Sequence, residues 1–201
     1  MRSEISELNS ELRIIAGKYK SRRVNSGNPE GKADCLKGRL SGYRPTTDRA
    51  RETLFNTLNN ILDFDSVTCL DLFAGSGALG FEAMSRGAAS CDFVETSQKQ
   101  TEYIAQTAGE LGCTDSIAIY KQDAISFLKK NPELEYDLIM ADPPYGYEFY
   151  NELNAEIVKH KFGIFVLEYG AEGAGMYDMN KYDVIDKKAG ITNFKILVSK
   201  E

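Results

Sequence analysis

Residues 66–87 read SVTCLDLFAGSGALGFEAMSRG, and this stretch decides the fold. Its first part, SVTCLDLF, is a nearly continuous apolar run of the kind that forms a strand buried on both faces of a sheet. Its last part, GALGFEAMSRG, predicts a helix that ends at Gly87. The loop between them, GSGALG at residues 75–80, matches the pattern G-x-G-x-x-G, which holds nucleotide-like ligands at the start of a helix.

Strand and helix patterns then alternate along the rest of the chain. Further strands are predicted at ASCDFVE, SIAIYKQD, YDLIMADPP and GIFVLEYG, and helices at SQKQTEYIAQTAGELG, AISFLKKN and FYNELNAEIVKHK. The final segment, YDVIDKKAGITNFKILVSK, predicts two strands around a glycine turn. This order predicts an α/β fold, a mostly parallel, doubly wound sheet with a C-terminal antiparallel hairpin.

The composition of the chain excludes several classes of protein. Among its 201 residues no apolar run approaches the roughly 18 residues of a membrane helix, and the opening MRSEISELNSEL lacks the apolar core of a secretory signal. The single histidine, His160, is expected at the solvent-facing end of a helix. The chain has four cysteines, which are too scattered for a zinc site or a redox pair: Cys35, Cys69, Cys91 and Cys113. We therefore expect no bound metal and a reducing, cytoplasmic environment. We also expect a monomer that does not contact a membrane.

Positive charge is concentrated near the N-terminus. Residues 13–51 hold eleven lysines and arginines against three acidic residues, a local charge of +8, which leaves −14 on the rest of a chain with net charge −6. A basic surface of this kind attracts phosphates. We therefore predict an RNA-contacting extension over residues 1–44, with a short hairpin at RIIAGKYKSRRV and a long loop over 25–42, and a main domain over residues 45–201. Its first helix is expected to begin near Asp48.

Acidic residues follow the predicted strands. Asp71 ends the first strand, Asp123 follows the third, and Glu95 follows the second at 20 residues after Gly75, the separation at which an acid reaches ribose hydroxyls. Ligands bind at the carboxyl ends of such strands, so these acids are expected around one ligand. A nicotinamide dinucleotide and S-adenosylmethionine both suit the loop and Glu95. Carboxylates repel a pyrophosphate and attract ammonium and sulfonium groups, which favours S-adenosylmethionine.

The fourth predicted strand ends in ADPPYG, and Asp142, Pro143, Pro144 and Tyr145 are predicted to hold the acceptor. A rigid Pro-Pro segment fixes two acceptors, the Asp142 carboxylate and a backbone carbonyl, that can hold the hydrogens of an exocyclic amine. This turns the nitrogen lone pair toward a methyl group, and Tyr145 offers a flat surface for a flipped base. Asp142 either takes the proton late or only polarises the amine.

In RIIAGKYKSRRV, RPTTDRARETLFN, CLDLFAGSGALGFEAMSRGA and MADPPY the chain resembles the RsmD family of ribosomal RNA methyltransferases. The resemblance implies a Rossmann-like class I S-adenosylmethionine-dependent methyltransferase. It further implies transfer of a methyl group to N2 of a guanine in 16S rRNA, within an assembling small subunit. Two features depart from the family: the segment 25–42 is long, and Tyr43 stands where an aliphatic residue is common.

The same resemblance assigns roles to individual positions. The positions implied to hold the cofactor are Asp71, Phe73, Ala74, Gly75, Gly77, Glu95, Asp123 and Ala124. The positions implied to face RNA are Arg13, Lys18, Arg22, Arg23, Arg44, Thr46, Arg49 and Arg51. Three alternatives stay open: an N6-adenine methyltransferase acting on DNA or RNA, an NAD-dependent oxidoreductase built on the literal glycine pattern, and a non-catalytic RNA-binding relative.

Overall fold

The computed structural model of the protein describes residues 12–26, 48–144, 146–169 and 177–200. None of the helices in this part of the chain is long and apolar enough to cross a membrane. The strands are β1 (Thr68–Leu72), β2 (Ser90–Glu95), β3 (Ile117–Lys121), β4 (Glu135–Ala141), β5 (Lys161–Tyr169), β6 (Tyr182–Ala189) and β7 (Thr192–Ser199). The helices are α2 (Asp48–Leu58), α3 (Ala78–Arg86), α4 (Gln98–Leu111), α5 (Ala124–Lys130) and α6 (Tyr150–Ile157), with a 3-10 turn η1 (Thr114–Ser116).

The strands form one sheet in the order β3-β2-β1-β4-β5-β7-β6. Strands β1 to β5 run parallel, whereas β7 is antiparallel to both β5 and β6. The predicted doubly wound sheet with a terminal hairpin is confirmed. From β1 the chain first builds outward to β2 and β3 and then returns to β4 on the other side, and ligands bind at such a reversal of strand order.

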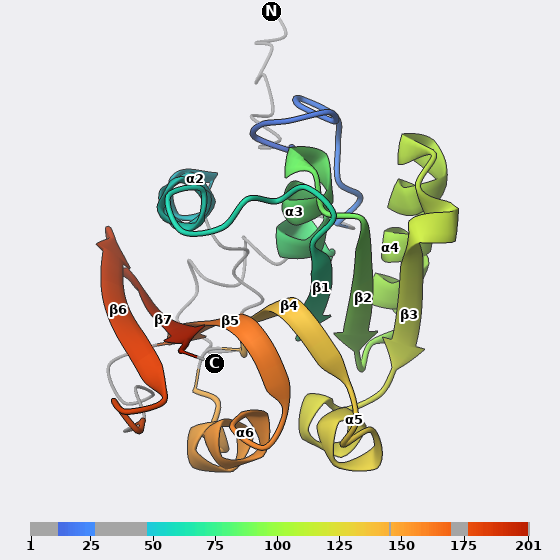
Figure 1. Ribbon diagram of the computed structural model, residues 1–201. Coiled ribbons are helices and arrows are strands. Elements are labelled where there is room, and N and C mark those ends of the chain that lie inside the picture. Colours follow the sequence, from blue (N-terminus) through green and yellow to red (C-terminus); the bar gives the residue numbers. More distant parts are fainter. Residues whose placement is uncertain (1–11, 27–47, 145, 170–176, 201) are drawn as a thin grey trace, which may run out of the picture.

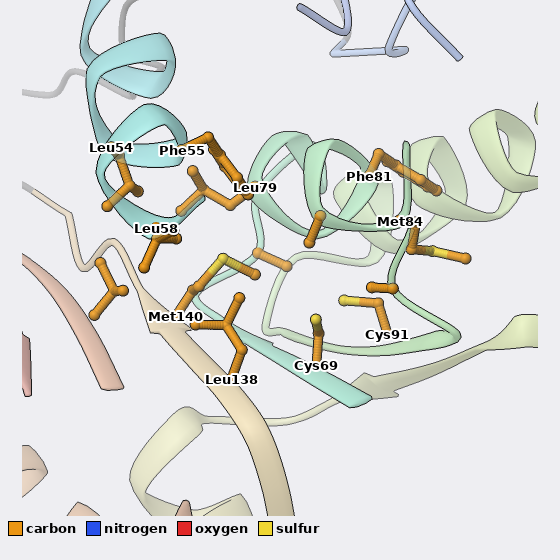
Figure 2. Packing of buried hydrophobic residues seen from close by; sticks show 14 of the residues in the cluster. Leu54, Phe55, Leu58, Cys69, Leu79, Phe81, Met84, Cys91, Leu138 and Met140 are labelled. Carbon is orange, nitrogen blue, oxygen red and sulfur yellow. The ribbon is translucent and has the colours of Figure 1, made fainter. Parts of the chain in front are cut away.

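Helices cover both faces of the sheet, with α2, α3 and α4 on one face and α5 and α6 on the other (Figure 1). The first face carries the larger apolar cluster, in which side chains of α2 and α3 meet those of β1, β2 and β4 (Figure 2). A second cluster joins α5 and α6 to the opposite face. Burial on both faces explains why β1 and β4 read as continuous apolar runs rather than alternating ones.

Residues 12–26, here called the basic arm, fold back on themselves. The predicted hairpin is a single antiparallel bridge between Arg13 and Arg23, supported by the N–H of Val24 donating to the carbonyl of Leu12 at 2.9 Å. Four apolar side chains of the arm belong to the larger cluster: Leu12, Ile14, Tyr19 and Val24. The basic arm therefore shares the core of the main sheet. The domain boundary predicted between residues 44 and 45 lies outside the described residues.

The prediction for His160 is wrong. This side chain is 7% exposed, and its ring nitrogens lie 3.0 Å from the carbonyl oxygen of Glu156 and 3.2 Å from that of Leu128. Carbonyls in the last turn of a helix lack partners within the helix. The imidazole meets such groups at the ends of both α5 and α6, which draws it inside.

Three cysteines of the described residues are free and buried. They are Cys69 of β1, Cys91 of β2 and Cys113, and Cys35 lies outside the described residues. Burial is the main cause that raises the pKa of Cys91 well above its usual value, so this thiol stays protonated.

Close packing at Gly80 gives the first testable prediction. A Cβ atom there would lie 2.3 Å from Cε1 of Phe93 and 2.6 Å from Sγ of Cys91. Gly80→Ala should therefore lower the free energy of unfolding by about 1–3 kcal/mol, measured by urea denaturation followed by circular dichroism.

Gly109 supplies the matched control, since a Cβ there meets no atom within 4 Å on α4. Gly109→Ala should raise the free energy of unfolding by up to about 1 kcal/mol, because alanine favours the helix. Equal stability of the two variants would contradict the close contact between α3 and β2.

Candidate active site

The strand register brings the predicted acids to one edge of the sheet. Leu72 at the end of β1 pairs with Val94 of β2 on one side and with Ala141 of β4 on the other. Glu95 and Asp142 are the next residues along those two neighbours. The carboxyl ends of β1, β2 and β4 therefore meet where the glycine loop begins.

Glu95 ties the glycine loop to its neighbours. Its Oε2 accepts the N–H of Gly75 at 2.8 Å, and its Oε1 accepts the N–H of Ser97 at 2.8 Å. Its backbone carbonyl accepts the N–H of Gln122 at 3.1 Å, which links the end of β3 to the same place. The half-buried carboxylate holds the loop in shape, and each oxygen keeps acceptor capacity for a ligand.

Asp71 lies inside the sheet behind the loop. The side chain is 1% exposed, and its Oδ2 accepts the N–H of Gly80 in the first turn of α3 at 2.9 Å. Burial raises the pKa of Asp71 to about 8, opposed by the Gly80 hydrogen bond and increased by the charges of Asp142 and Glu95. Three carboxyl groups thus interact here, and a cationic ligand would relieve their repulsion.

Asp123 and Ala124 follow β3. The Oδ1 of Asp123 accepts the N–H of Ser126 at 2.9 Å and caps α5, while the residue stays exposed. Ala124 is buried beneath it. The hydrogen bond to Ser126 holds the Asp123 side chain in place, and its exposure leaves it accessible to a ligand at the carboxyl edge of the sheet.

The predicted acceptor loop leaves β4 at the same edge. Asp142 is half-buried, Pro143 is buried and Pro144 is exposed. The carbonyl of Pro144 accepts the N–H of Tyr147 at 3.0 Å, which closes a turn. Tyr145 lies outside the described residues.

Tyr147, which the sequence reasoning missed, joins the two loops. Its ring lies edge-on to Phe73 of the glycine loop, with ring centroids 5.1 Å apart, and it also contacts Tyr150 and Phe149 at 5.4 and 5.8 Å. Burial, with a smaller contribution from Asp123, raises the pKa of Tyr147 to about 12. The aromatic run YGYEFY at residues 145–150 is the sequence signal for this cluster.

The positions expected to face RNA divide into three groups. Arg44 and Thr46 lie outside the described residues. The exposed ones are Arg13, Lys18, Arg22, Arg23 and Arg49. Two of them also brace the chain: Arg13 Nη1 donates to the carbonyl of Ser21 at 2.8 Å, and Arg22 Nη2 to that of Glu110 at 2.6 Å. Most of the basic arm's cations therefore stand at the surface.

Arg51 requires a correction. It is 0% exposed, and its Nη2 donates to the carbonyl of Arg13 at 2.5 Å and to Oδ1 of Asp48 at 3.0 Å. Arg51 shares a helical face with Leu54, Phe55 and Leu58, so the apolar period of α2 directs it inward. Arg51 supports the basic arm from within and is left out of the proposed RNA-facing surface.

A family model described as Conserved hypothetical protein 95 matches residues 12–198. Ribosomal RNA small subunit methyltransferase D of Buchnera aphidicola is 34% identical over 153 residues, which cover 76% of this chain and 71% of that protein. The chain belongs to the RsmD family. The protein of the same name from Haemophilus influenzae is 36% identical over 139 residues, covering 68% of this chain and 65% of that protein.

A solved structure of a candidate methyltransferase from Escherichia coli has the same fold. It superposes with a TM-score of 0.75 at 24% identity and covers 95% of this chain and 99% of that one. The RsmD-family chain therefore has the class I methyltransferase fold, as predicted. Among the described residues, no group of three or more His, Cys, Asp or Glu side chains is placed to hold a metal ion.

The raised pKa of Asp71 predicts a pH-dependent stability. At pH values between the ordinary pKa of an aspartate and about 8, Asp71 keeps its proton in the folded state and loses it in the unfolded state. The free energy of unfolding therefore falls as pH rises through this range. Relative to Asp71→Asn, the wild type should lose up to about 1.4 kcal/mol per pH unit between about pH 5 and 7.5. Urea denaturation across this range measures the difference.

The exposed Asp115→Asn is the control for the change in net charge. It should follow the wild-type pH profile. If the free energy of unfolding of Asp71→Asn changed with pH in parallel with that of the wild type, Asp71 would be ionised in the folded protein.

Proposed function

We propose that this chain transfers a methyl group from S-adenosylmethionine to the N2 amine of a guanine in 16S rRNA. The observation that carries the proposal is the strand register, which brings Asp71 and Glu95, beside the glycine loop, to the same sheet edge as Asp142 of the acceptor loop. A site for a cationic methyl donor and a site for an amine thus adjoin at one sheet edge. The names of the RsmD-family relatives support ribosomal RNA of the small subunit as the substrate.

The residues at the carboxyl edge suit S-adenosylmethionine. This cofactor supplies an electrophilic methyl group on a positively charged sulfur. We assign the ribose hydroxyls to Glu95, the adenine to Asp123 with Ala124, and the methionine part to the loop from Phe73 to Gly77. The negative charges of Asp142 and Glu95, which act on Asp71, support a cationic ligand over a dinucleotide, since a pyrophosphate would add to the repulsion.

Asp142 and the prolines prepare the acceptor. The carboxylate of Asp142 accepts a hydrogen bond from the guanine amine and increases the electron density on its nitrogen. Pro143 and Pro144 fix the backbone, so a carbonyl at a set position can hold the second hydrogen. Both contacts orient the lone pair, and orientation is a large source of rate enhancement.

The exposed cations of the basic arm are assigned to the RNA backbone. Each phosphate contact releases counterions, so binding of the RNA should weaken steeply as salt increases. The acidic remainder of the chain confines attraction to this side. The arm thus gives affinity, whereas the acceptor loop selects the reacting group.

The direct test incubates the protein with labelled S-adenosylmethionine and undermethylated small-subunit particles, followed by nucleoside analysis of the RNA. We expect N2-methylguanine. Asp142→Asn should lower kcat about hundredfold, because the amine loses its charged acceptor. The exposed Glu148→Gln, an equal change of charge nearby, should keep the wild-type rate.

Other products would select the alternatives. N6-methyladenine in DNA or RNA would replace guanine by adenine as the acceptor, and binding of NAD without binding of S-adenosylhomocysteine would favour an oxidoreductase. Full activity of Asp142→Asn would remove Asp142 from the acceptor site.

Cofactor and RNA binding should separate by mutation. Glu95→Ala should weaken S-adenosylhomocysteine binding about tenfold or more in calorimetry, because a carboxylate acceptor and its hold on the loop are lost. RNA affinity should stay close to wild type. Reversing the charges of Arg22 and Arg23 to Glu should do the opposite, and the reverse pattern would contradict the two assignments.

A further inference from the structure

The backbone of the basic arm is bound by a buried carboxylate of α3. Glu82 is 0% exposed, and its Oε2 accepts the N–H of Ile15 at 2.7 Å. Its Oε1 accepts the N–H of Ala16 at 3.2 Å and Nε of Arg86 at 2.9 Å. Three donors thus converge on one carboxylate. Two of them come from residues far away in the sequence.

Ser85, one turn further along α3, binds the next part of the arm. The N–H of Tyr19 donates to its Oγ at 2.8 Å, the N–H of Lys18 donates to its carbonyl at 2.6 Å, and its hydroxyl donates to the carbonyl of Ala16. Gly17 crosses the helix so closely that a Cβ would lie 1.8 Å from the Ser85 carbonyl oxygen. The contact is therefore specific in position and not only apolar.

Burying a carboxylate is costly unless its partners are well placed. An apolar residue at position 82 would pack the arm without this cost, but it would leave the N–H groups of Ile15 and Ala16 without their acceptor. The carboxylate instead fixes where the chain of the arm crosses α3. The Glu82 carboxylate thus gives the basic arm a defined position on α3.

The same helix begins at the glycine loop. α3 starts at Ala78, directly after Gly77 of that loop, and Asp71 accepts the N–H of Gly80 in its first turn. Nine helical residues span about 13 Å, with the loop at the start of the helix and the arm bound from its middle at Glu82 to its last turn at Ser85, so one short rigid element joins the loop to the arm. Figure 1 shows the arm beside the end of α3 that lies away from the sheet edge.

From this geometry we infer that Glu82 is a positioning residue, which together with Ser85 sets the RNA-binding arm at a fixed distance from the methyl donor. The inference rests on the proposed function for the identity of the two ligands. The exposed cations Lys18, Arg22 and Arg23 belong to an arm whose backbone is already fixed by Glu82 and Ser85 before RNA binds. Such preorganisation increases affinity by reducing the entropy lost on binding.

Glu82→Gln is the first test variant. The glutamine has the same shape, but its amide NH2 would face one of the three donors that now point at a carboxylate. Glu156→Gln on α6 is the matched control: Glu156 is also buried, lies in a helix on the other face of the sheet, and accepts Nζ of Lys159 at 2.7 Å. Both variants change the net charge equally.

Gly17→Ala is the second variant, because it acts from the arm and leaves α3 intact. Its Cβ meets the Ser85 carbonyl, and Gly17 has φ +81°, a conformation that side chains disfavour. A shared effect of Glu82→Gln and Gly17→Ala would be due to the contact between the basic arm and α3 and not to damage of the helix core.

Three quantities are measured on full-length protein. Hydrogen-exchange mass spectrometry should show exchange in residues 12–26 at least about tenfold faster in both variants than in the wild type and Glu156→Gln. Affinity for undermethylated small-subunit particles should fall about tenfold, with a matching rise in KM for the particles. Calorimetric affinity for S-adenosylhomocysteine should change less than about twofold.

The outcomes separate this inference from the proposed function. Faster exchange with unchanged particle affinity would overturn the positioning role, as would unchanged exchange or an equal loss of S-adenosylhomocysteine affinity. A wild-type protein that binds the particles but transfers no methyl group would overturn the proposed activity, and the binding of the variants would still decide the role of Glu82.

Discussion

The central position of β1 is the constraint on which the rest of the structure depends. β1 is hydrogen-bonded in parallel to β2 on one side and to β4 on the other, so all three carboxyl ends open at one place. Helices cover both faces of the sheet, which leaves that edge as the opening for a ligand. The arrangement also brings together the carboxyl groups of Asp71, Glu95 and Asp142, and their repulsion is resolved in part by keeping a proton on Asp71.

Three acids at this edge bind backbone N–H groups of the protein itself. Asp71 accepts the N–H of Gly80, Glu95 accepts those of Gly75 and Ser97, and Asp123 caps α5. These bonds hold the loops without any ligand. A site built this way needs little reorganisation when a cofactor enters, because its acceptors are already directed by the fold.

Helix α3 connects the ligand edge with the basic arm. One side of it packs against β2 through Gly80 and Phe93, and its last turns bind the arm through Glu82 and Ser85. Both contacts depend on small or polar residues in a helix of only nine residues. A short helix is stiff, so a shift at one end would move the other end with it.

The alternation of apolar runs and glycine loops determined the sheet, its helices and the edge at which Asp71, Glu95, Asp123 and Asp142 stand, because strand and helix periods are local and parallel strands share one edge. Only the tertiary structure decided which carbonyl groups meet the buried side chains of Arg51 and His160, and that Glu82 accepts the N–H of Ile15, 67 residues away in sequence. Charge and helical spacing state which residues are polar and which face they share. They do not state which distant carbonyl or N–H group each polar side chain will meet, since that depends on how segments far apart in the sequence pack together.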